Sequence, residues 1–101
     1  MFVVPFPEQF ARPFSREAIE SLTPNQFGVY GILNANGWIY VGRGNIRERL
    51  LAHLTGADGI PGIRLNRPTR FVTEITGNSA MRERELIAEL DPVCNRTAKG
   101  S

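Results

Sequence analysis

The sequence predicts a single small α/β domain, and three observations lead to that class. A chain of 101 residues, 42% apolar and 22% charged, has the size and composition of one globular domain. Segments 27–33 and 38–41 are rich in β-branched and aromatic residues and flank an Asn-Gly turn signal, which is typical of a β-hairpin. Apolar residues at helical spacing predict one helix after the hairpin and another over residues 79–90.

Residues 1–26 are expected to form an N-terminal extension. Its first 14 residues alternate Phe and Pro, lack the features of a signal peptide, and are expected to lie extended over the domain. The phenylalanines predicted to cover the core are Phe2, Phe6, Phe10 and Phe14. Ser15 can cap a short helix that runs through Leu22, with Glu17 in its first turn, before Pro24 ends it.

The register of the hairpin decides whether Tyr30 and Tyr40 share a face. A plain two-residue Asn-Gly turn pairs residues whose numbers sum to 73 and places the two tyrosines on opposite faces. A three-residue loop with a bulged glycine gives a sum of 72 and places both on one face. We expect the second geometry, because only it lets the two hydroxyls share a site.

Asn45 is the predicted N-cap of the next helix, with Glu48 at the position that closes a capping box. The apolar stripe of this helix consists of Ile46, Leu50, Leu51 and Leu54. Arg49 and His53 lie four residues apart along one edge of the stripe. We therefore expect them at a rim, outside the core and away from the solvated face.

The second half of the chain is expected to hold one loop, one strand and one helix. Residues 55–68 carry Gly and Pro and predict a loop with a short helical turn near Ile63. Residues 69–76 alternate as a third strand, which predicts Phe71, Thr73 and Ile75 on one face. A helix over 79–90 follows, and residues 96–101 are expected to be a flexible tail.

Glu83 lies among apolar residues of this last helix. It stands three, four and seven residues before Leu86, Ile87 and Leu90, in the middle of their stripe. The opposite, solvated face is predicted to carry Arg82, Glu85 and Glu89. A carboxylate on a buried stripe must be neutralised, paired with a cation or bound to a metal. Two interpretations stay open: a salt bridge to an arginine, or a single carboxylate ligand for Mg²⁺.

Charge and cysteine content narrow the class of protein. The net charge is only +2, but eleven of the twelve cationic residues are arginines, which suit bidentate phosphate contact. From charge alone, composition bias with a solvated surface is favoured over nucleic-acid binding. No apolar run approaches the roughly 20 residues that span a bilayer, so no membrane association is expected. With Cys94 alone and no zinc-like spacing, we expect an intracellular, cytoplasmic protein without disulfides.

Each candidate residue has an ordinary interpretation when taken alone. Tyr30 and Tyr40 would be strand aromatics, Arg49 a surface arginine and His53 a rim histidine. Together with Glu83 they supply the parts that phosphodiester cleavage needs. These parts are a base to activate water, a fixed cation for the pentacovalent phosphate, and a metal ion on an oxygen of the bond that breaks.

The motifs resemble one known family. Gly28-Val29-Tyr30 and Tyr40-Val41-Gly42, followed in order by Arg49, His53, Glu83 and Asn95, resemble the GIY-YIG nuclease domain. That domain occurs in homing endonucleases, some restriction enzymes and the incision subunit of bacterial nucleotide-excision repair. The resemblance covers residues 27–95, with valines at 29 and 41 in place of isoleucines. It implies a three-stranded antiparallel sheet flanked by helices.

The resemblance also implies a role for each motif residue. Tyr30 would be the general base or the residue that orients water, and Tyr40 would hydrogen-bond a phosphate oxygen. Arg49 would stabilise charge in the transition state. His53 would orient or deprotonate the tyrosine, and Glu83 would hold one Mg²⁺ or Mn²⁺ ion.

Asn95 would brace the loop that closes the site. Nuclease domains of this family usually come with a separate DNA-binding domain, and 101 residues leave no room for one. DNA affinity would then depend on a homodimer, on a partner protein, or on arginines of this domain: Arg43, Arg47, Arg64, Arg67 and Arg70. Two alternatives remain: a nucleic-acid-binding module that no longer cuts, and an interaction domain whose Phe/Pro-rich N-terminus docks on another protein.

Overall fold

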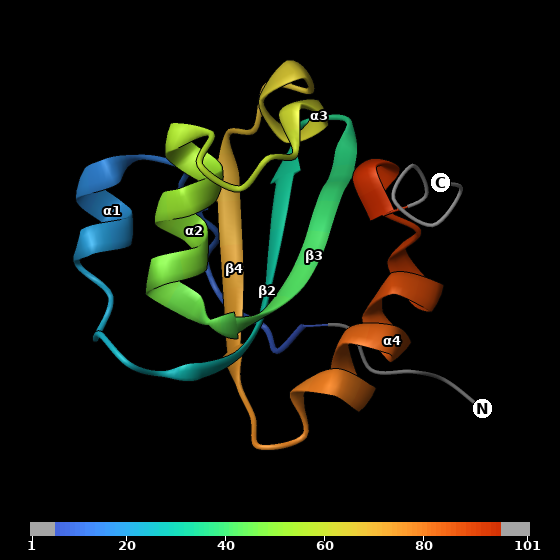
Figure 1. The fold of residues 1–101 in the computed structure, drawn as a ribbon. Coiled ribbons are helices and arrows are strands. Elements are labelled where there is room, and N and C mark those ends of the chain that lie inside the picture. Colours follow the sequence, from blue (N-terminus) through green and yellow to red (C-terminus); the bar gives the residue numbers. More distant parts are fainter. Residues whose placement is uncertain (1–5, 96–101) are drawn as a thin grey trace.

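Four antiparallel strands in the order β1-β4-β2-β3 form the sheet of this computed structural model, which describes residues 6–95 (Figure 1). The strands are β1 (Arg12–Pro13), β2 (Phe27–Asn34), β3 (Gly37–Asn45) and β4 (Arg70–Ile75). The helices are α1 (Arg16–Glu20), α2 (Ile46–Thr55), α3 (Pro61–Leu65) and α4 (Ser79–Leu90). The expected α/β class is confirmed, but the sheet has four strands and not the expected three. The additional strand, β1, comes from the N-terminal extension and pairs with β4.

The hairpin places both tyrosines on one face, as expected. Tyr30 pairs with Gly42 and Ile32 pairs with Tyr40, which is the register whose residue numbers sum to 72. The expected three-residue loop is wrong, because Asn34 pairs with Gly37 across a two-residue turn. The register then shifts between Ile32 and Leu33, which leaves an extra residue on β3. This bulge, and not the turn, brings the two phenols to the same side.

The sheet has a hydrophobic core on each face, which explains why β2 is apolar along most of its length. The first core joins the sheet to α1, α2 and α3, and its buried members are Ile19, Tyr30, Ile32, Ile39, Ile46, Leu50, Ile63, Phe71 and Cys94. The second core joins the sheet to α4 and the N-terminal segment, and its buried members are Phe6, Val29, Val41, Val72 and Leu86. Figure 1 shows α2 in front of the sheet and α4 beside β3.

The N-terminal phenylalanines differ in how far they are buried. Phe6 is buried and stacks on Trp38 with ring centroids 5.5 Å apart, and Phe14 packs against the first core. Phe10 is 97% exposed, so the expectation that it covers the core is wrong. It lies on the short stretch between Phe6 and β1. Phe2 lies outside the described residues.

Most of the predicted helix ends are confirmed. Ser15 Oγ accepts a hydrogen bond from Ala18 N at 3.2 Å, although α1 ends at Glu20 and not at Leu22. Asn45 caps α2, and α4 has the predicted bounds. The turn near Ile63 is α3.

The face predicted for β4 is confirmed, because Phe71, Thr73 and Ile75 pair with alternate residues of β2 without a shift of register. Ile75, the last residue of the strand, is 62% exposed. The expected tail over residues 96–101 lies outside the described residues. Across residues 6–95, no helix has the length and apolarity needed to cross a membrane.

Candidate active site

Tyr30 and Tyr40 lie side by side on the face of the sheet that α2 covers. Their ring centroids are 6.4 Å apart, with Tyr30 fully buried and Tyr40 partly exposed. Gly42 makes this arrangement possible. A Cβ at that position would lie 2.6 Å from Cζ of Tyr30 and 2.8 Å from Cε2 of Tyr40, and closer still to the Tyr30 hydroxyl. The Tyr30 ring therefore occupies the space that any side chain at position 42 would need.

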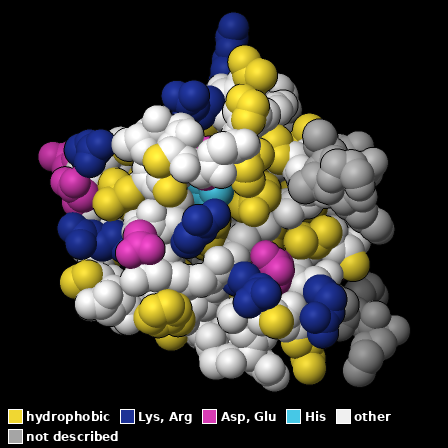
Figure 2. Space-filling view, in the orientation of Figure 1, with side chains coloured by type: hydrophobic (Ala, Val, Ile, Leu, Met, Phe, Trp, Pro, Cys, Tyr) yellow, Lys and Arg dark blue, Asp and Glu magenta, His cyan; other side chains and the backbone are white. Residues whose placement is uncertain are grey.

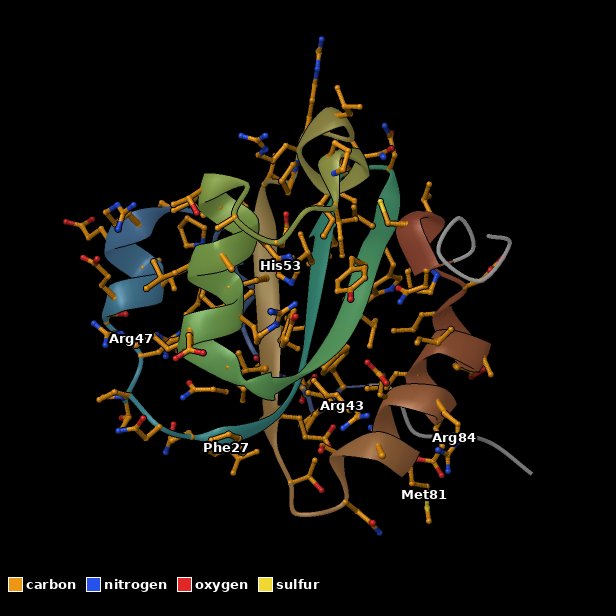
Figure 3. All side chains as sticks on the ribbon, in the orientation of Figure 1. Phe27, Arg43, Arg47, His53, Met81 and Arg84 are labelled. Carbon is orange, nitrogen blue, oxygen red and sulfur yellow. The ribbon has the colours of Figure 1, made fainter. Side chains whose placement is uncertain are left out.

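His53 is fully buried, so its expected position at a rim is wrong. Its Nε2 lies 2.6 Å from the Tyr30 hydroxyl, and its Nδ1 contacts the carboxylate of Asp58. The apolar stripe of α2 predicted a rim, but the loop that follows the helix folds back and covers this edge. Figure 3 places His53 between α2 and the sheet, and only a small part of the histidine is visible in the space-filling view of the same face (Figure 2).

Asp58 is the site residue that sequence reasoning missed. It lies in the loop between α2 and α3, and its side chain is 2% exposed. Its Oδ1 accepts a hydrogen bond from Ile60 N at 2.9 Å, and its Oδ2 faces His53. The only signal in the sequence was an aspartate between Gly56 and Gly59, which is typical of turns in general. Nothing in that pattern connects it with His53, because the contact depends on the path of the loop.

Burial controls the protonation of the two phenols. It raises the pKa of Tyr30 well above its usual value, with a smaller upward contribution from Tyr40 and a downward one from a hydrogen bond with Arg49. Burial also raises the pKa of Tyr40, and the carboxylate of Glu83 raises it further. Both phenols are therefore protonated at neutral pH, so Tyr30 can act as a base only by giving up its own proton in the same step.

In the His53–Asp58 pair, the pKa of each group is lowered. Burial lowers the pKa of His53, and the contact with Asp58 only partly opposes that effect. For Asp58, burial raises the pKa, but the Ile60 N–H and His53 together outweigh it, so the pKa is lowered. A neutral imidazole and a charged carboxylate follow at neutral pH. A neutral imidazole next to the Tyr30 hydroxyl can accept a proton.

Arg49 lies one helical turn before His53 and joins the same cluster. A hydrogen bond with Tyr30 raises the pKa of Arg49, so its guanidinium stays charged. The stem of its side chain crosses β3 at Gly44, where an added Cβ would lie 3.4 Å from Arg49 Cγ. Gly44 has a φ of +128°, which favours glycine. The absence of a side chain at Gly44 therefore leaves room for the Arg49 side chain next to β3.

Glu83 is partly buried, with 24% of its side chain exposed. Its Oε1 lies 3.3 Å from Nε of Arg43, which comes from β3. Glu83 also raises the pKa of Tyr30 and Tyr40, so its carboxylate is within electrostatic range of both phenols. The geometry thus combines the two interpretations of this residue: it is paired with an arginine, and the pair stands next to the candidate site.

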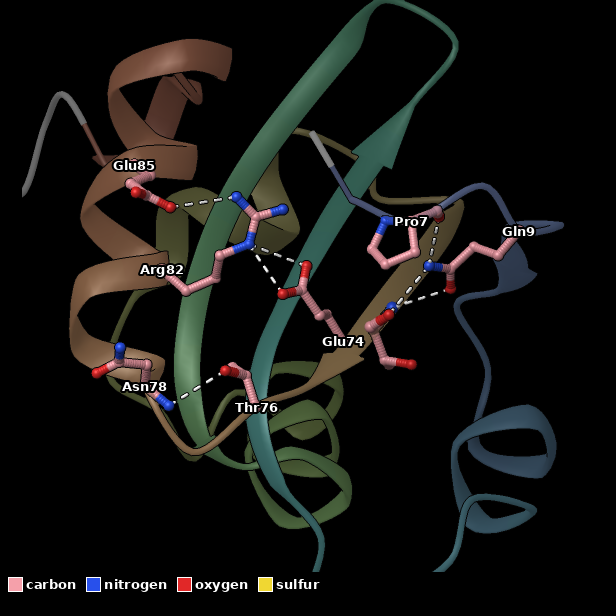
Figure 4. A network of polar contacts seen from close by, with 8 residues as sticks. Pro7, Gln9, Glu74, Thr76, Asn78, Arg82 and Glu85 are labelled. Atoms are coloured by element: carbon pink, nitrogen blue, oxygen red, sulfur yellow. Dashed lines mark hydrogen bonds and ion pairs between the residues drawn. The ribbon is translucent and has the colours of Figure 1, made fainter. Parts of the chain in front are cut away.

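The expectation that Arg82 lies on the solvated face of α4 is wrong. Only 14% of its side chain is exposed, and its Nε donates to both carboxylate oxygens of Glu74 at 3.0 and 2.8 Å (Figure 4). A further contact runs to Glu85 at 3.4 Å. The reason is that α4 returns along the sheet directly after β4, so its first turns face the end of that strand. Glu85 is half-buried, and Glu89 is exposed as expected.

Glu83 is the carboxylate that could hold a metal ion at this site. Across the described part of the chain, no group of three or more His, Cys, Asp or Glu side chains is gathered as a metal cage. Mg²⁺ needs few protein ligands and is often held by one or two carboxylates with water and phosphate oxygens. The side chain of Glu83 is 24% exposed, and half of the side chain of its partner Arg43 lies in solvent. The Glu83 carboxylate is therefore accessible enough to serve as that ligand.

The five arginines expected to contact DNA do not form a single patch. Figure 3 shows Arg43 toward α4 and Arg47 at the outer side of α2, with His53 between them. Arg47 is partly buried, and within residues 6–95 its Nε has no hydrogen-bond partner. Arg64, Arg67 and Arg70 are exposed. Their contact with DNA stays a prediction.

Asn95 contacts β3 directly, and both hydrogen bonds of its side chain go to Val41. Its Oδ1 accepts from Val41 N at 2.8 Å, and its Nδ2 donates to Val41 O at 3.0 Å. The side-chain amide therefore pairs with the open edge of β3, one residue after Tyr40. This contact is a physical basis for the expected bracing role, which stays a prediction.

Comparison with known proteins leaves the family open. A scan against protein-family models found no match, and a search of curated proteins found no similar sequence. The chemistry of the site must therefore be inferred from its own residues.

Proposed function

We propose that this protein is a metal-dependent DNA endonuclease of the GIY-YIG type, which hydrolyses phosphodiester bonds. The observation that supports this most strongly is the environment of the Tyr30 hydroxyl. It lies 2.6 Å from a neutral imidazole nitrogen of His53, and the charge of Arg49 lowers its pKa against the effect of burial. A proton acceptor and a fixed cation on one phenol are the parts that activate water and stabilise a charged phosphate.

Tyr30 would pass a proton in a single concerted step. Its raised pKa makes a resting phenolate unfavourable at neutral pH. In the proposed step the attacking water gives a proton to the phenol oxygen while the phenol gives its own proton to His53 Nε2. The oxygen of the water forms the new bond to phosphorus as the bond to the leaving oxygen breaks.

The remaining residues would act on the phosphate. Arg49 would neutralise charge that develops on its oxygens, and Tyr40, which is partly exposed, would donate a hydrogen bond to one of them. Glu83 would hold Mg²⁺ or Mn²⁺ after exchanging its contact with Arg43. When bound, the ion supplies positive charge for the leaving oxygen.

DNA is the proposed partner of this surface. The exposed arginines, among them Arg64, Arg67 and Arg70, would supply contacts with phosphates that do not depend on base sequence. Since they do not form one patch, sequence or structure preference would come from a homodimer or from a partner protein. A cytoplasmic location is part of the same proposal.

A cleavage assay tests the proposal. Supercoiled plasmid, linear duplex, flap and junction DNA would be incubated with the protein in Mg²⁺ or Mn²⁺. We expect cleavage of at least one substrate, and a loss on the order of 10²- to 10³-fold for Arg49→Ala. Arg16→Ala is the matched control, because Arg16 is exposed on α1 and pairs only with Glu20 on the same helix. Failure to cut any of these substrates in either metal would contradict the proposal.

The ion pair between Glu83 and Arg43 favours one alternative function. A carboxylate already neutralised by arginine has less need of a metal ion, as in a nucleic-acid-binding module that no longer cuts. Such a module would bind DNA with strong salt dependence and would leave it intact in every divalent metal. The same assay, combined with binding measured at two salt concentrations, separates the two functions.

A further inference from the structure

Asp58 is a buried carboxylate next to His53. Its carboxylate is almost fully enclosed, which is costly for a charged group unless both oxygens find donors. Both do: Oδ1 accepts from Ile60 N at 2.9 Å, and Oδ2 faces His53 Nδ1. The loop backbone thus fixes one oxygen and thereby aims the other at the imidazole.

This contact determines which nitrogen of His53 carries the hydrogen. An ionised carboxylate can only accept hydrogen bonds, so Nδ1 must donate to Asp58. In a neutral imidazole Nε2 is then an acceptor, and the Tyr30 hydroxyl 2.6 Å away must donate to it. The direction of both hydrogen bonds is therefore set by a residue that does not touch the phenol.

We propose that Asp58 is a positioning residue that acts through His53. It holds the imidazole as the Nδ1–H tautomer with Nε2 aimed at Tyr30, and it stabilises the imidazolium that forms when Nε2 takes the phenol proton. The imidazolium then returns its proton through solvent to the leaving oxygen, which balances the step. The catalytic part of this inference rests on the proposed function, whereas the tautomer does not.

Other charged and titratable groups surround the pair and must be considered with it. Arg49, on the same helix as His53, opposes a second positive charge on the imidazole. Arg64, from α3, favours the charged form of Asp58. The ring of Tyr40 contacts His53 edge-on at 5.1 Å between centroids. Among residues 6–95, Asp58 is thus the one anion in direct contact with His53, and it offsets the repulsion from Arg49.

Asp58→Asn distinguishes positioning from mere packing, since it keeps the shape of the side chain. With its oxygen still accepting from Ile60 N, the new amide would turn its NH₂ toward His53 Nδ1. Nδ1 must then accept, which moves the ring hydrogen to Nε2 and removes the acceptor for Tyr30. Asp91→Asn is the matched control, because Asp91 is the only other aspartate, is exposed, and has a φ of 47° that asparagine adopts readily.

Nitrogen NMR of the imidazole tests the tautomer without DNA or metal, and the chain has only one histidine. At pH 8 we expect a protonated Nδ1 and an unprotonated Nε2 in the wild type and in Asp91→Asn, and the reverse in Asp58→Asn. A wild-type spectrum with the hydrogen on Nε2 would overturn the inference, whether or not Asp58→Asn folds. So would a folded Asp58→Asn variant that keeps the wild-type pattern.

Plasmid nicking tests the catalytic consequence. For Asp58→Asn we expect kcat to fall on the order of 10²-fold while KM for DNA changes less than about threefold, with Asp91→Asn at the wild-type rate. A folded Asp58→Asn variant with normal kcat would overturn the positioning role. Absence of nicking by the wild type would instead contradict the proposed function, and the NMR result would still decide how Asp58 orients His53.

Discussion

At the scale of single residues, Tyr30 depends on groups from separate parts of the chain. Its ring needs the empty space at Gly42 on β3, and its hydroxyl needs His53 and Arg49 on α2. In the sequence, Gly42 is only the last residue of the Tyr40-Val41-Gly42 motif. The structure gives it a steric role, because the Tyr30 ring across from it leaves no room for a methyl group.

Gly42→Ala should therefore damage both stability and the site. The added methyl group would displace the Tyr30 ring, at a cost of about 1–3 kcal/mol in the free energy of unfolding and with loss of most nicking activity. Urea unfolding and plasmid nicking check this. Gly77→Ala is the control, since no atom lies within 4 Å of a Cβ at that position. Equal effects of the two substitutions would show that Gly42 has no special steric role.

The burial of His53 predicts how stability depends on pH. Its pKa in the folded state lies below the ordinary value of 6.5, so in the window just below pH 6.5 the unfolded chain binds a proton that the folded chain does not. The free energy of unfolding should thus fall as pH falls from 6.5, by at most about 1.4 kcal/mol per pH unit. It should be flat with respect to this group above that window.

Urea unfolding between pH 7.5 and 5.5 measures this dependence. Since His53 is the only histidine, His53→Gln should remove the slope in that range while leaving the response of the carboxylates at lower pH. A wild-type free energy of unfolding that stays constant or increases toward pH 5.5 would contradict the assigned pKa direction.

At the scale of elements, α4 is fixed to the sheet by a polar network as well as by its apolar stripe. Arg82 pairs with Glu74 of β4, and Asn78 N donates to Thr76 Oγ1 at the turn between the two elements (Figure 4). Glu83 is the next residue after Arg82 on the helix that this network fixes to the sheet.

Arg82→Ala should destabilise the protein by about 1–3 kcal/mol, because it leaves the enclosed carboxylate of Glu74 without its cation. Chemical unfolding monitored by circular dichroism measures the change. In Arg16→Ala, which removes an ion pair whose side chains are 57% and 44% exposed, the change should stay below about 1 kcal/mol. Similar losses in the two variants would show that the Arg82 network contributes no more than a surface pair.

The open edges of the sheet are covered by side-chain amides. Gln9 exchanges hydrogen bonds with Thr73 N and O on β4, and Asn95 does the same with Val41 on β3. Each amide imitates one residue of a neighbouring strand and satisfies backbone groups that would otherwise be free to pair with another chain. Neither contact could be predicted, because each joins residues more than 50 positions apart in sequence.

At the scale of the whole molecule, the predictable features were those encoded by local pattern. The bounds of α4 and the Asn45 cap follow from periodicity and capping residues. The shared face of the two tyrosines was expected because it lets their hydroxyls share a site, and the register shift between Ile32 and Leu33 that produces it was not predicted. The two-residue strand β1 has no periodic signal, and its Pro13 argues against a strand. It forms only because β4 offers a free edge.

Tertiary contacts account for the features that were missed or wrong. Asp58 reaches His53 because the loop after α2 folds back, and that path depends on α3 packing into the first core. The orientation of Arg82 was wrong because Arg82 stands four residues before Leu86 and so lies beside the apolar stripe, where Glu74 of β4 pairs with it. In both cases the deciding partner comes from another element.

The most direct measurement of the central claim compares two glutamates of α4 as magnesium is varied. Plasmid nicking would be followed against Mg²⁺ concentration for Glu83→Gln and for Glu89→Gln, which alters an exposed residue of the same helix. If the carboxylate beside the phenols serves the reaction, Glu83→Gln should lose on the order of 10²-fold or more in rate, and Glu89→Gln should follow the wild-type curve. Equal, metal-dependent rates in the two variants would contradict the account.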